Sequence, residues 1–284
     1  MTDDEIEELT IAAGPHRWRV LRAGAGPVAL CLHGAGGSAD SFRPLIPFLS
    51  SDVTIVAPDL PGHGRTRLGG TGRSGLVAMT EDVALLVAAF ELEPEILIGH
   101  SAGAAIALNL DDRLSPRGQV LINAALSEFD GLAGWVFPAL AKGLSITPFA
   151  ADFLSRNLRR QGKLEGLLAS TGSEVTRDIL TRYRLLAASR EHVDGTLKMM
   201  AAWDLKPLLR KIPQVQTPTL LIAGDRDGTV PVSVSKKAKQ SLKHSKLIVH
   251  EGGHLLHEED PEIVAQDIRA FINSLDKDAQ SSSD

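Results

Sequence analysis

Short apolar runs alternate along the chain with longer segments whose apolar residues recur at helical spacing. Because strands that alternate with helices assemble into parallel sheets, this order predicts an α/β protein with a mostly parallel central sheet flanked by helices. Leu9–Ile11 and Trp18–Leu21 flank Gly14, which predicts an opening hairpin, and residues 79–90 have the pattern of an amphipathic helix. The strand runs occupy residues 27–32, 53–57, 95–98, 119–122, 219–223 and 246–249, and those at 27–32 and 219–223 have the pattern of buried strands.

The last part of the chain predicts one more helix and a tail. Asp260 is a favourable helix cap and Pro261 a favourable first helical residue. Residues 276–284 are polar, and we expect them to be disordered. The inner side of the predicted helix consists of Ile263, Val264, Ile268, Phe271 and Ile272.

Residues 127–203 show helical periodicity and no clear strand. They predict a helical cap, inserted after the strand at 119–122 into a core made of residues 1–126 and 204–275. Thr171–Glu174 has the spacing of a capping box, which predicts that a helix begins there. The apolar face of that helix consists of Val175, Ile179 and Tyr183.

Gly99–Gly103 reads G-x-S-x-G between a strand-type run and a strong helix former. A strand that turns sharply into a helix holds the central serine in a strained backbone conformation with its hydroxyl exposed. Small residues at both ends of the motif let this turn close and let the helix lie near the sheet. Ser101 is therefore the candidate nucleophile.

A serine hydroxyl needs a base to take its proton, and an acid to orient that base. Asp227 follows the strand run at 219–223 as the candidate acid, and His254 follows the run at 246–249 as the candidate base. The order serine, acid, histidine is that of the α/β-hydrolase arrangement. We expect all these loops to lie at one edge of the sheet, where the side chains converge.

Several other residues compete for these roles. Asp225 is an alternative acid in the same turn, with Asp227 then a plain turn residue. His250 and His257 compete with His254, which is favoured because Gly252-Gly253 before it indicates a close backbone approach. The histidines also suggest a metal site, but their spacing matches no known zinc pattern, so no metal and no cofactor are expected.

The segment 33–38 follows the strand run at 27–32 and is rich in glycine. Acyl transfer places negative charge on a carbonyl oxygen, which preoriented backbone N–H groups stabilise. Ala102, directly after the nucleophile, and Ala35, in the glycine-rich turn, are the candidate donors of this oxyanion hole. The alternative is that the glycines only make a tight turn.

Two features of the cap bear on the ligand. The apolar segment 131–140 is expected to line a greasy pocket, to touch a membrane surface or to belong to the core. Arg156, Arg159, Arg160 and Lys163 form a basic patch that is either a solvated face or a grip on substrate carboxylates. The candidate pocket residues are His33, His100, Trp135, Phe137, Met200 and Trp203.

Composition narrows the class of partner. The chain has 284 residues and a formal net charge of −5, without a basic stripe of the kind that binds nucleic acid. No apolar run reaches the length of a membrane span, and the acidic first residues do not resemble a secretory signal. Cys31 is the only cysteine and lies in a predicted core strand, so we expect a cytoplasmic protein.

These motifs together resemble the α/β-hydrolase superfamily over almost the whole chain. A narrower resemblance, to the BchO-type accessory proteins of magnesium chelatase, includes parts of the cap. It implies a role near magnesium insertion in bacteriochlorophyll biosynthesis, with chelatase subunits as partners. The segments that carry it are Trp18–Val20, Gly99–Ile106, Asn123–Leu126, Gly131–Gly134, Thr171–Ser173, Met199–Leu205 and His254–Glu259.

Three hypotheses for function follow. The first is a serine hydrolase acting on an ester or acyl bond of an apolar substrate, which the resemblance suggests is a tetrapyrrole. The second is a non-catalytic protein that binds porphyrin and delivers it, with the cap arginines holding its propionates. The third is a carboxylesterase of broad specificity. The complete set of serine, histidine and aspartate favours the first hypothesis, because a carrier does not need it.

Overall fold

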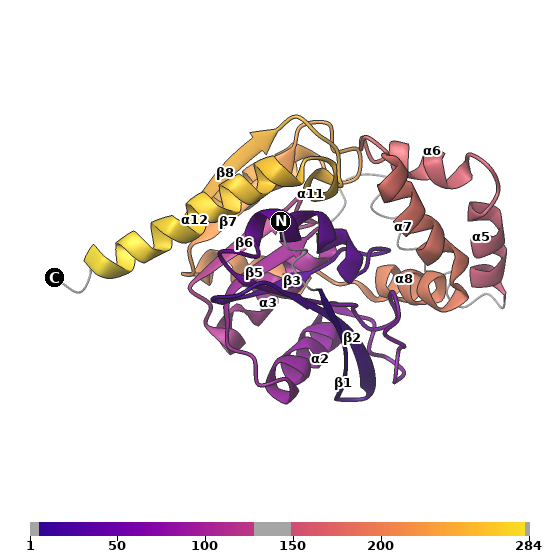
Figure 1. Ribbon diagram of the computed structural model, residues 1–284, viewed down its shortest axis with the longest axis horizontal. Coiled ribbons are helices and arrows are strands. Elements are labelled where there is room, and N and C mark those ends of the chain that lie inside the picture. The colour runs from indigo at the N-terminus through magenta and orange to yellow at the C-terminus, as the bar shows by residue number, and fades with distance from the viewer. Residues whose placement is uncertain (1–5, 128–148, 282–284) are drawn as a thin grey trace.

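The computed structural model describes residues 6–127 and 149–281. Within them a single sheet has eight strands in the order β1-β2-β4-β3-β5-β6-β7-β8 (Figure 1). The pairs β1–β2 and β2–β4 are antiparallel and all other pairs are parallel, so the predicted hairpin and mostly parallel sheet are confirmed. The strands are β1 (Glu7–Ala13), β2 (His16–Ala23), β3 (Val28–Leu32), β4 (Thr54–Pro58), β5 (Pro94–His100), β6 (Gly118–Ile122), β7 (Thr219–Gly224) and β8 (Ser245–His250).

Helices cover both faces of the sheet, and each face has its own apolar core. One core lies against α2, α3, α9, η2 and α10, and the other against η1, α1, α11 and α12. These helices are η1 (Ala39–Leu45), α1 (Ile46–Leu49), α2 (Leu76–Ala89), α3 (Ala102–Leu114), α9 (Lys206–Lys211), η2 (Ile212–Gln214), α10 (Val232–Ser241), α11 (Leu256–Glu259) and α12 (Pro261–Ser281).

Strand β3 shows why the apolar runs are continuous. Leu30 and Leu32 belong to the core under α2 and α3, whereas Ala29 and Cys31 belong to the core on the opposite face. Successive side chains of a strand point to opposite faces, so a central strand covered on both sides needs apolar residues at every position. Cys31 is fully buried, and burial raises the pKa of its thiol well above the ordinary range.

The end of the chain departs from the prediction. Helix α12 begins at Pro261, with the Asp260 carboxylate accepting the Ile263 N–H, and its predicted inner side packs into the core. It then continues to Ser281, so the prediction of disorder from Asp276 onward was wrong for residues 276–281. Lysine, alanine and glutamine favour helix, and no proline or glycine stops it there.

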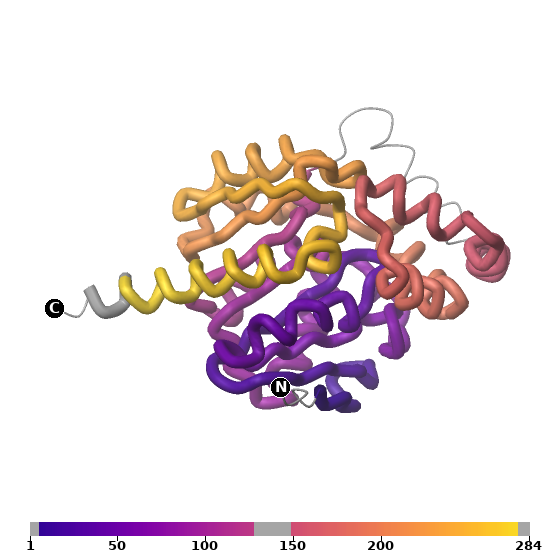
Figure 2. Tube along the Cα trace, turned by 45° about the horizontal axis from the view of Figure 1, so that its top comes forward, coloured from indigo at the N-terminus to yellow at the C-terminus, as the bar shows by residue number. Residues whose placement is uncertain are grey.

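Helices α5 (Ala150–Leu158), α6 (Lys163–Ala169), α7 (Arg177–Ala188) and α8 (Arg190–Ala202) lie between β6 and β7 in the chain, and we call them the cap helices. Figure 2 shows them gathered at the end of the molecule opposite the C-terminus. The division of the chain at residues 127 and 203 stays a prediction. Within the described residues, no helix combines the length and apolar character needed to cross a bilayer.

The predicted capping box at Thr171 was wrong. Helix α7 begins at Arg177, and the hydroxyl of Thr176 accepts the Ile179 N–H as its cap. The Thr171 hydroxyl instead donates to the carbonyl of Leu168 at the end of α6. A threonine hydroxyl satisfies a free carbonyl after a helix as readily as a free N–H before one, so the pattern was ambiguous.

Candidate active site

Ser101 occupies the turn between β5 and α3, with φ 52° and ψ −115°. This conformation is strained for a residue with a side chain, and it is held by glycines on both sides. A Cβ at Gly99 would lie 2.5 Å from the Cα of Ala104, and one at Gly103 would lie 2.0 Å from the carbonyl oxygen of Leu32. The G-x-S-x-G motif therefore forms the sharp strand-to-helix turn that the sequence predicted.

His254 and Asp227 form a buried hydrogen-bonded pair. The Nδ1 atom of His254 lies 2.7 Å from Oδ2 of Asp227. The other carboxylate oxygen accepts the backbone N–H groups of Thr229 and Val230, each at 2.7 Å. With its Nδ1 proton held by the carboxylate, the imidazole keeps Nε2 free to accept a second proton. The structure thus brings together the two residues selected as base and acid.

The competing residues have other partners. The carboxylate of Asp225 accepts the N–H of Gly252 at 3.2 Å. Nε2 of His250 lies 2.6 Å from the carboxylate of Asp267 on α12. Across residues 6–127 and 149–281 no group of three or more histidine, cysteine or acidic side chains could hold a metal ion.

His257 lies behind the site without any exposure, and its ring packs 4.4 Å from that of His100 and 5.4 Å from that of Phe42, centroid to centroid. Neither ring nitrogen of His257 has a hydrogen-bond partner within the described chain. Burial lowers its pKa to about 3, so this imidazole is neutral and serves as packing.

Asn123 and His100 hold the His254 loop against the nucleophile turn. The amide nitrogen of Asn123 donates to the carbonyls of Gly253 and His254, both at 2.9 Å, and its oxygen accepts the Gly224 N–H at 2.8 Å. Nε2 of His100, next to Ser101 in the chain, lies 2.8 Å from the carbonyl of His254. Sequence reasoning missed this role of Asn123, although a polar residue directly after a buried strand was a usable signal.

A segment of the cap contacts both the turn that carries Asp227 and the loop that carries His254. The carbonyl of Thr171 accepts the N–H groups of Gly228, beside the acid, at 3.0 Å and of His254 at 3.2 Å. The hydroxyl of Ser173 accepts the Leu255 N–H at 2.9 Å. We call residues 171–173 the clamp, because they link the acid turn and the base loop through three hydrogen bonds.

The clamp also explains the glycine directly before His254. A Cβ at Gly253 would lie 2.3 Å from the backbone of Gly172, and one at Gly172 would lie 1.7 Å from the carbonyl oxygen of Arg226. The close backbone approach predicted before His254 is therefore confirmed at Gly253, with the clamp as the approaching backbone, whereas a Cβ at Gly252 would lie 2.5 Å from the side chain of Leu256. Side chains at Gly172 or Gly253 would push the loops apart.

The candidate oxyanion donors lie on either side of Ser101. A Cβ at Gly34 would be 2.9 Å from the Cβ of Ser101, so the 33–36 turn lies directly against the nucleophile. Ala35 is exposed, and its N–H makes no hydrogen bond to any described residue. Ala102 is the first residue of α3, where the helix offers its N–H no acceptor. The oxyanion role of these two amides stays a prediction.

Two of the predicted pocket residues brace loops. His33 is fully buried, with Nδ1 2.8 Å from the Gly34 carbonyl and Nε2 accepting the Leu60 N–H at 2.9 Å. Burial holds the pKa of His33 well below its usual value, and that of His100 as well, so both rings are neutral. Within the cap, Met200 is half-buried.

Trp203, between the cap and the core, is half-buried and packs on the core beneath α2 and α3. Trp135 and Phe137 lie outside the described residues. The pocket as a whole stays a prediction, because the contacts described above do not place its candidate residues around one cavity.

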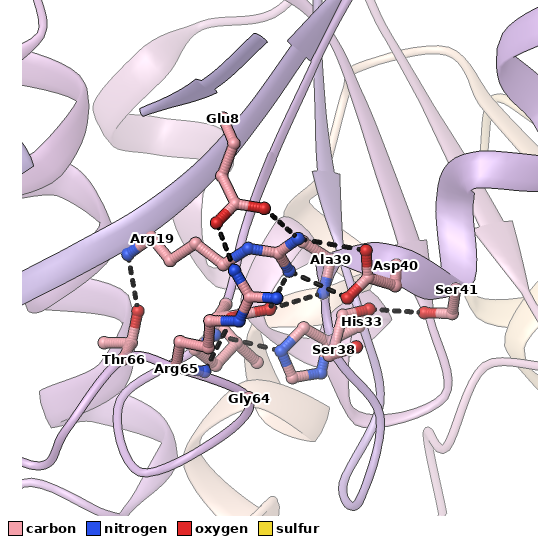
Figure 3. Close-up of polar contacts among 12 residues, drawn as sticks. Glu8, Arg19, His33, Ser38, Ala39, Asp40, Ser41, Gly64, Arg65 and Thr66 are labelled. Atoms are coloured by element: carbon pink, nitrogen blue, oxygen red, sulfur yellow. Dashed lines mark hydrogen bonds and ion pairs between the residues drawn. The ribbon is translucent and has the colours of Figure 1, made fainter. Parts of the chain in front are cut away.

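A buried cation anchors the helix that follows the oxyanion turn (Figure 3). Arg19 on β2 is 5% exposed, and its guanidinium bonds to Glu8, Asp40 and Asp59 at 2.8, 2.8 and 3.4 Å. Asp59 in turn accepts the N–H of Ala39, the first residue of η1, at 2.8 Å. Burial raises the pKa of Asp59, and the charge of Arg19 opposes that rise.

We expect Arg19→Met to lower the free energy of unfolding by about 3–5 kcal/mol, because it leaves the fully buried carboxylate of Asp59 without its cation. Urea denaturation followed by circular dichroism measures this loss. The matched control is Arg65→Met, which removes an arginine that also pairs with Glu8 but is 69% exposed, and it should cost less than about 1 kcal/mol. Equal losses in both variants would contradict the anchoring role.

Comparison with known proteins agrees with this architecture. Residues 29–267 match the profile of the alpha/beta hydrolase family. The chain is 45% identical over 248 residues to the magnesium-chelatase 30 kDa subunit of Rhodobacter capsulatus, covering 86% of this chain and 87% of that protein. It is 30% identical over 261 residues to the pimeloyl-[acyl-carrier protein] methyl ester esterase of Xanthomonas axonopodis pv. citri, covering 89% and 97%.

Among solved structures, a putative lipase from Acinetobacter baumannii superimposes with a TM-score of 0.81 at 21% identity. The match covers 96% of this chain and 93% of the lipase chain. At this identity the likeness is one of fold alone.

Proposed function

Because this chain belongs to the alpha/beta hydrolase family, and within it to the BchO-type magnesium-chelatase accessory proteins, we propose that it is a serine hydrolase serving the magnesium-chelatase step of bacteriochlorophyll biosynthesis. The substrate class is an ester or related acyl compound with an apolar body, and a tetrapyrrole ester fits both the family and the chemistry. The proposed place of action is the cytoplasm, with chelatase subunits as partners.

The chemistry proceeds through an acyl-enzyme. The Oγ atom of Ser101 attacks the ester carbonyl while Nε2 of His254 takes the hydroxyl proton. The carboxylate of Asp227 stabilises the imidazolium that forms, and the N–H groups of Ala35 and Ala102 bind the oxyanion. The tetrahedral intermediate collapses, and the alcohol leaves with the proton from His254. Water then attacks the acyl-enzyme while His254 takes a proton from the water. His254 returns that proton to Oγ of Ser101 as the carboxylic acid leaves.

One observation carries this proposal: the 2.7 Å hydrogen bond between His254 and Asp227 in a molecule whose Ser101 occupies a strained turn. A strained serine costs about 1–3 kcal/mol, and a buried ion-pairing histidine is costly as well. A protein that only binds its ligand gains nothing from either feature.

A second candidate function is porphyrin binding and delivery without catalysis. The finding that favours it is that the relative at 45% identity is named a magnesium-chelatase 30 kDa subunit. In this hypothesis the serine and histidine are remnants, and the cap holds the macrocycle for transfer to the chelatase.

A fluorophosphonate probe separates these functions. If Ser101 is activated, the purified protein should be labelled at Ser101 within minutes, and Ser101→Ala should remain unlabelled. Ser274→Ala, which removes an exposed serine on α12, is the matched control and should label like the parent. Peptide mass spectrometry identifies the modified residue.

The opposite outcome is equally informative. Folded protein that resists the probe, yet quenches protoporphyrin fluorescence at low micromolar concentration, would reject the hydrolase and support the carrier. A labelled protein whose porphyrin titration shows no quenching would keep the hydrolase but remove the tetrapyrrole as its substrate.

A further inference from the structure

Helix α5, at the outer end of the cap, exposes aromatic and cationic side chains together. Phe149, at its cap position, and Phe153 are 76% and 71% exposed, and Arg156 and Arg160 are exposed as well. We propose that this face docks the protein onto the surface of an anionic phospholipid bilayer. The proposal is independent of the reaction at Ser101.

Within α5, Phe153 and Arg156 are three residues apart and lie on one side of the helix. Phe149 is the left-handed N-cap before them and Arg160 follows the C-cap after them, and we call these four exposed side chains the stripe. The opposite side of α5 packs against the other cap helices. Ala151 packs against α8, and the hydroxyl of Ser155 donates to the carbonyl of Ala187 on α7 at 2.8 Å. The exposed stripe is therefore held outward by the packing of the buried one.

Exposed apolar side chains concentrate in this part of the molecule. Among described residues seven large apolar side chains are exposed, and four of them belong to α5–α7 or the turn before α5. The two phenylalanines are the most apolar and bulky of the set. Aromatic side chains favour the boundary between lipid headgroups and acyl chains, where burying one phenylalanine stabilises association. The seven are Val77, Leu85, Phe149, Phe153, Leu167, Leu185 and Val249.

The basic side chains of the stripe and of the residues just after it make no ion pair with any described residue. Asp152 bonds to Arg190 at 2.8 Å and Glu165 to Arg184 at 2.6 Å, so the nearby carboxylates are already engaged. Within the described chain no ion pair involves the basic side chains of the stripe and its C-terminal continuation. These are Arg156, Arg159, Arg160 and Lys163.

The local charge is opposite to that of the whole chain. Residues 150–190 hold eight arginines and lysines against four acidic residues, in a protein whose formal net charge is −5. A positive end on a negative molecule orients it toward an anionic surface, and each basic side chain near such a surface adds roughly 1 kcal/mol of attraction. Charge complementarity thus selects a bilayer with anionic headgroups over a neutral one.

The position of α5 argues against the two other readings of this patch. Both views place α5 at the extremity of the cap, beyond α7 and α8 as seen from the sheet (Figures 1 and 2). A grip on substrate carboxylates would face the nucleophile turn between β5 and α3 instead. A plain solvated face would not carry two exposed phenylalanines close to the arginines in the chain.

Vesicle flotation of the full chain tests the proposal. The parent should bind vesicles of mixed phosphatidylglycerol and phosphatidylcholine, and bind phosphatidylcholine alone far more weakly. Arg156→Gln/Arg159→Gln/Arg160→Gln should lower the partition coefficient on anionic vesicles about 100-fold. The matched control neutralises three exposed lysines of α10, Lys236→Gln/Lys237→Gln/Lys239→Gln, and should bind within about threefold of the parent.

The aromatic contribution has its own pair of variants. Phe153→Ser should weaken binding about tenfold, whereas Leu85→Ser, at an exposed apolar position on α2, should leave it unchanged. Circular dichroism and probe labelling of Ser101 confirm that each variant is folded.

Two results would overturn the proposal. One is a parent protein that does not float with anionic vesicles, or that loses binding equally in both charge variants. The other is a dimer in lipid-free buffer that Phe153→Ser dissociates, which would assign the face to a second copy of the chain.

Discussion

Ser101→Ala is expected to reduce the rate of hydrolysis of an activated aryl ester by about 10⁵-fold, to the residual level that binding and the oxyanion hole provide. The reason is geometric. Ser101 presents its side chain from a strained turn that the glycines on both sides enforce, and no other hydroxyl can take that position. Steady-state kinetics with a p-nitrophenyl ester measure the effect, with a folded variant verified by its melting temperature.

The same substitution tests the physiological role. In a strain lacking this protein, Ser101→Ala should fail to restore bacteriochlorophyll, while Ser274→Ala should restore it fully. Complete rescue by Ser101→Ala would reject catalysis as the role in the cell, even if the purified parent hydrolyses esters. In that case porphyrin delivery would become the better hypothesis.

Asp227→Asn is expected to lower kcat by about 10⁴-fold with little change in KM. An asparagine amide can still accept the N–H groups of Thr229 and Val230, so the turn is retained. However, it offers His254 no charge to stabilise the imidazolium, and it permits the wrong tautomer. The variant therefore isolates the electrostatic contribution of the carboxylate.

Asp225→Asn is the matched control, because it makes the same change two residues away in the same turn. Asp225 bonds to the N–H of Gly252, and no hydrogen bond or ion pair joins it to His254. We expect its kcat to fall less than about tenfold. If both variants lose activity equally, the damage comes from the turn and not from the acid.

The elements that could be predicted from the sequence were the strands that are buried on both faces, because their residues are apolar at successive positions. The strand runs at 27–32 and 219–223 are apolar except for Thr219, and both became interior strands of the sheet. The loops after such strands share one edge of the sheet, so Asp227 and His254 could be paired without knowing the distance between them. Asn123 carried one local signal, a polar residue directly after a buried strand, but its role could not be predicted because the backbone groups that its amide bonds lie 101 and 130 residues away in the chain.

The clamp could not have been predicted, for a related reason. Its partners lie more than 50 residues away in the chain, and a local reading of Thr171–Glu174 gave a helix start instead. The roles of His33 and His100 were similarly ambiguous, because a histidine in such a loop either faces the ligand or supports a neighbouring backbone segment. Their hydrogen bonds to backbone groups in the structure show that both support the backbone. Helix α12 continues beyond residue 275, where the prediction ended it, because a polar composition by itself does not end a helix.

The clamp has a consequence for engineering this scaffold. Since the Thr171 carbonyl and the Ser173 hydroxyl accept N–H groups from the loops that carry Asp227 and His254, a cap grafted from another member of the family would remove these contacts along with the substrate cover. A chimera that keeps residues 171–173 should preserve turnover while specificity changes. A chimera that omits them should fold but lose the alignment of the His254 imidazole with the Asp227 carboxylate. The cap and these two loops should therefore be transferred together.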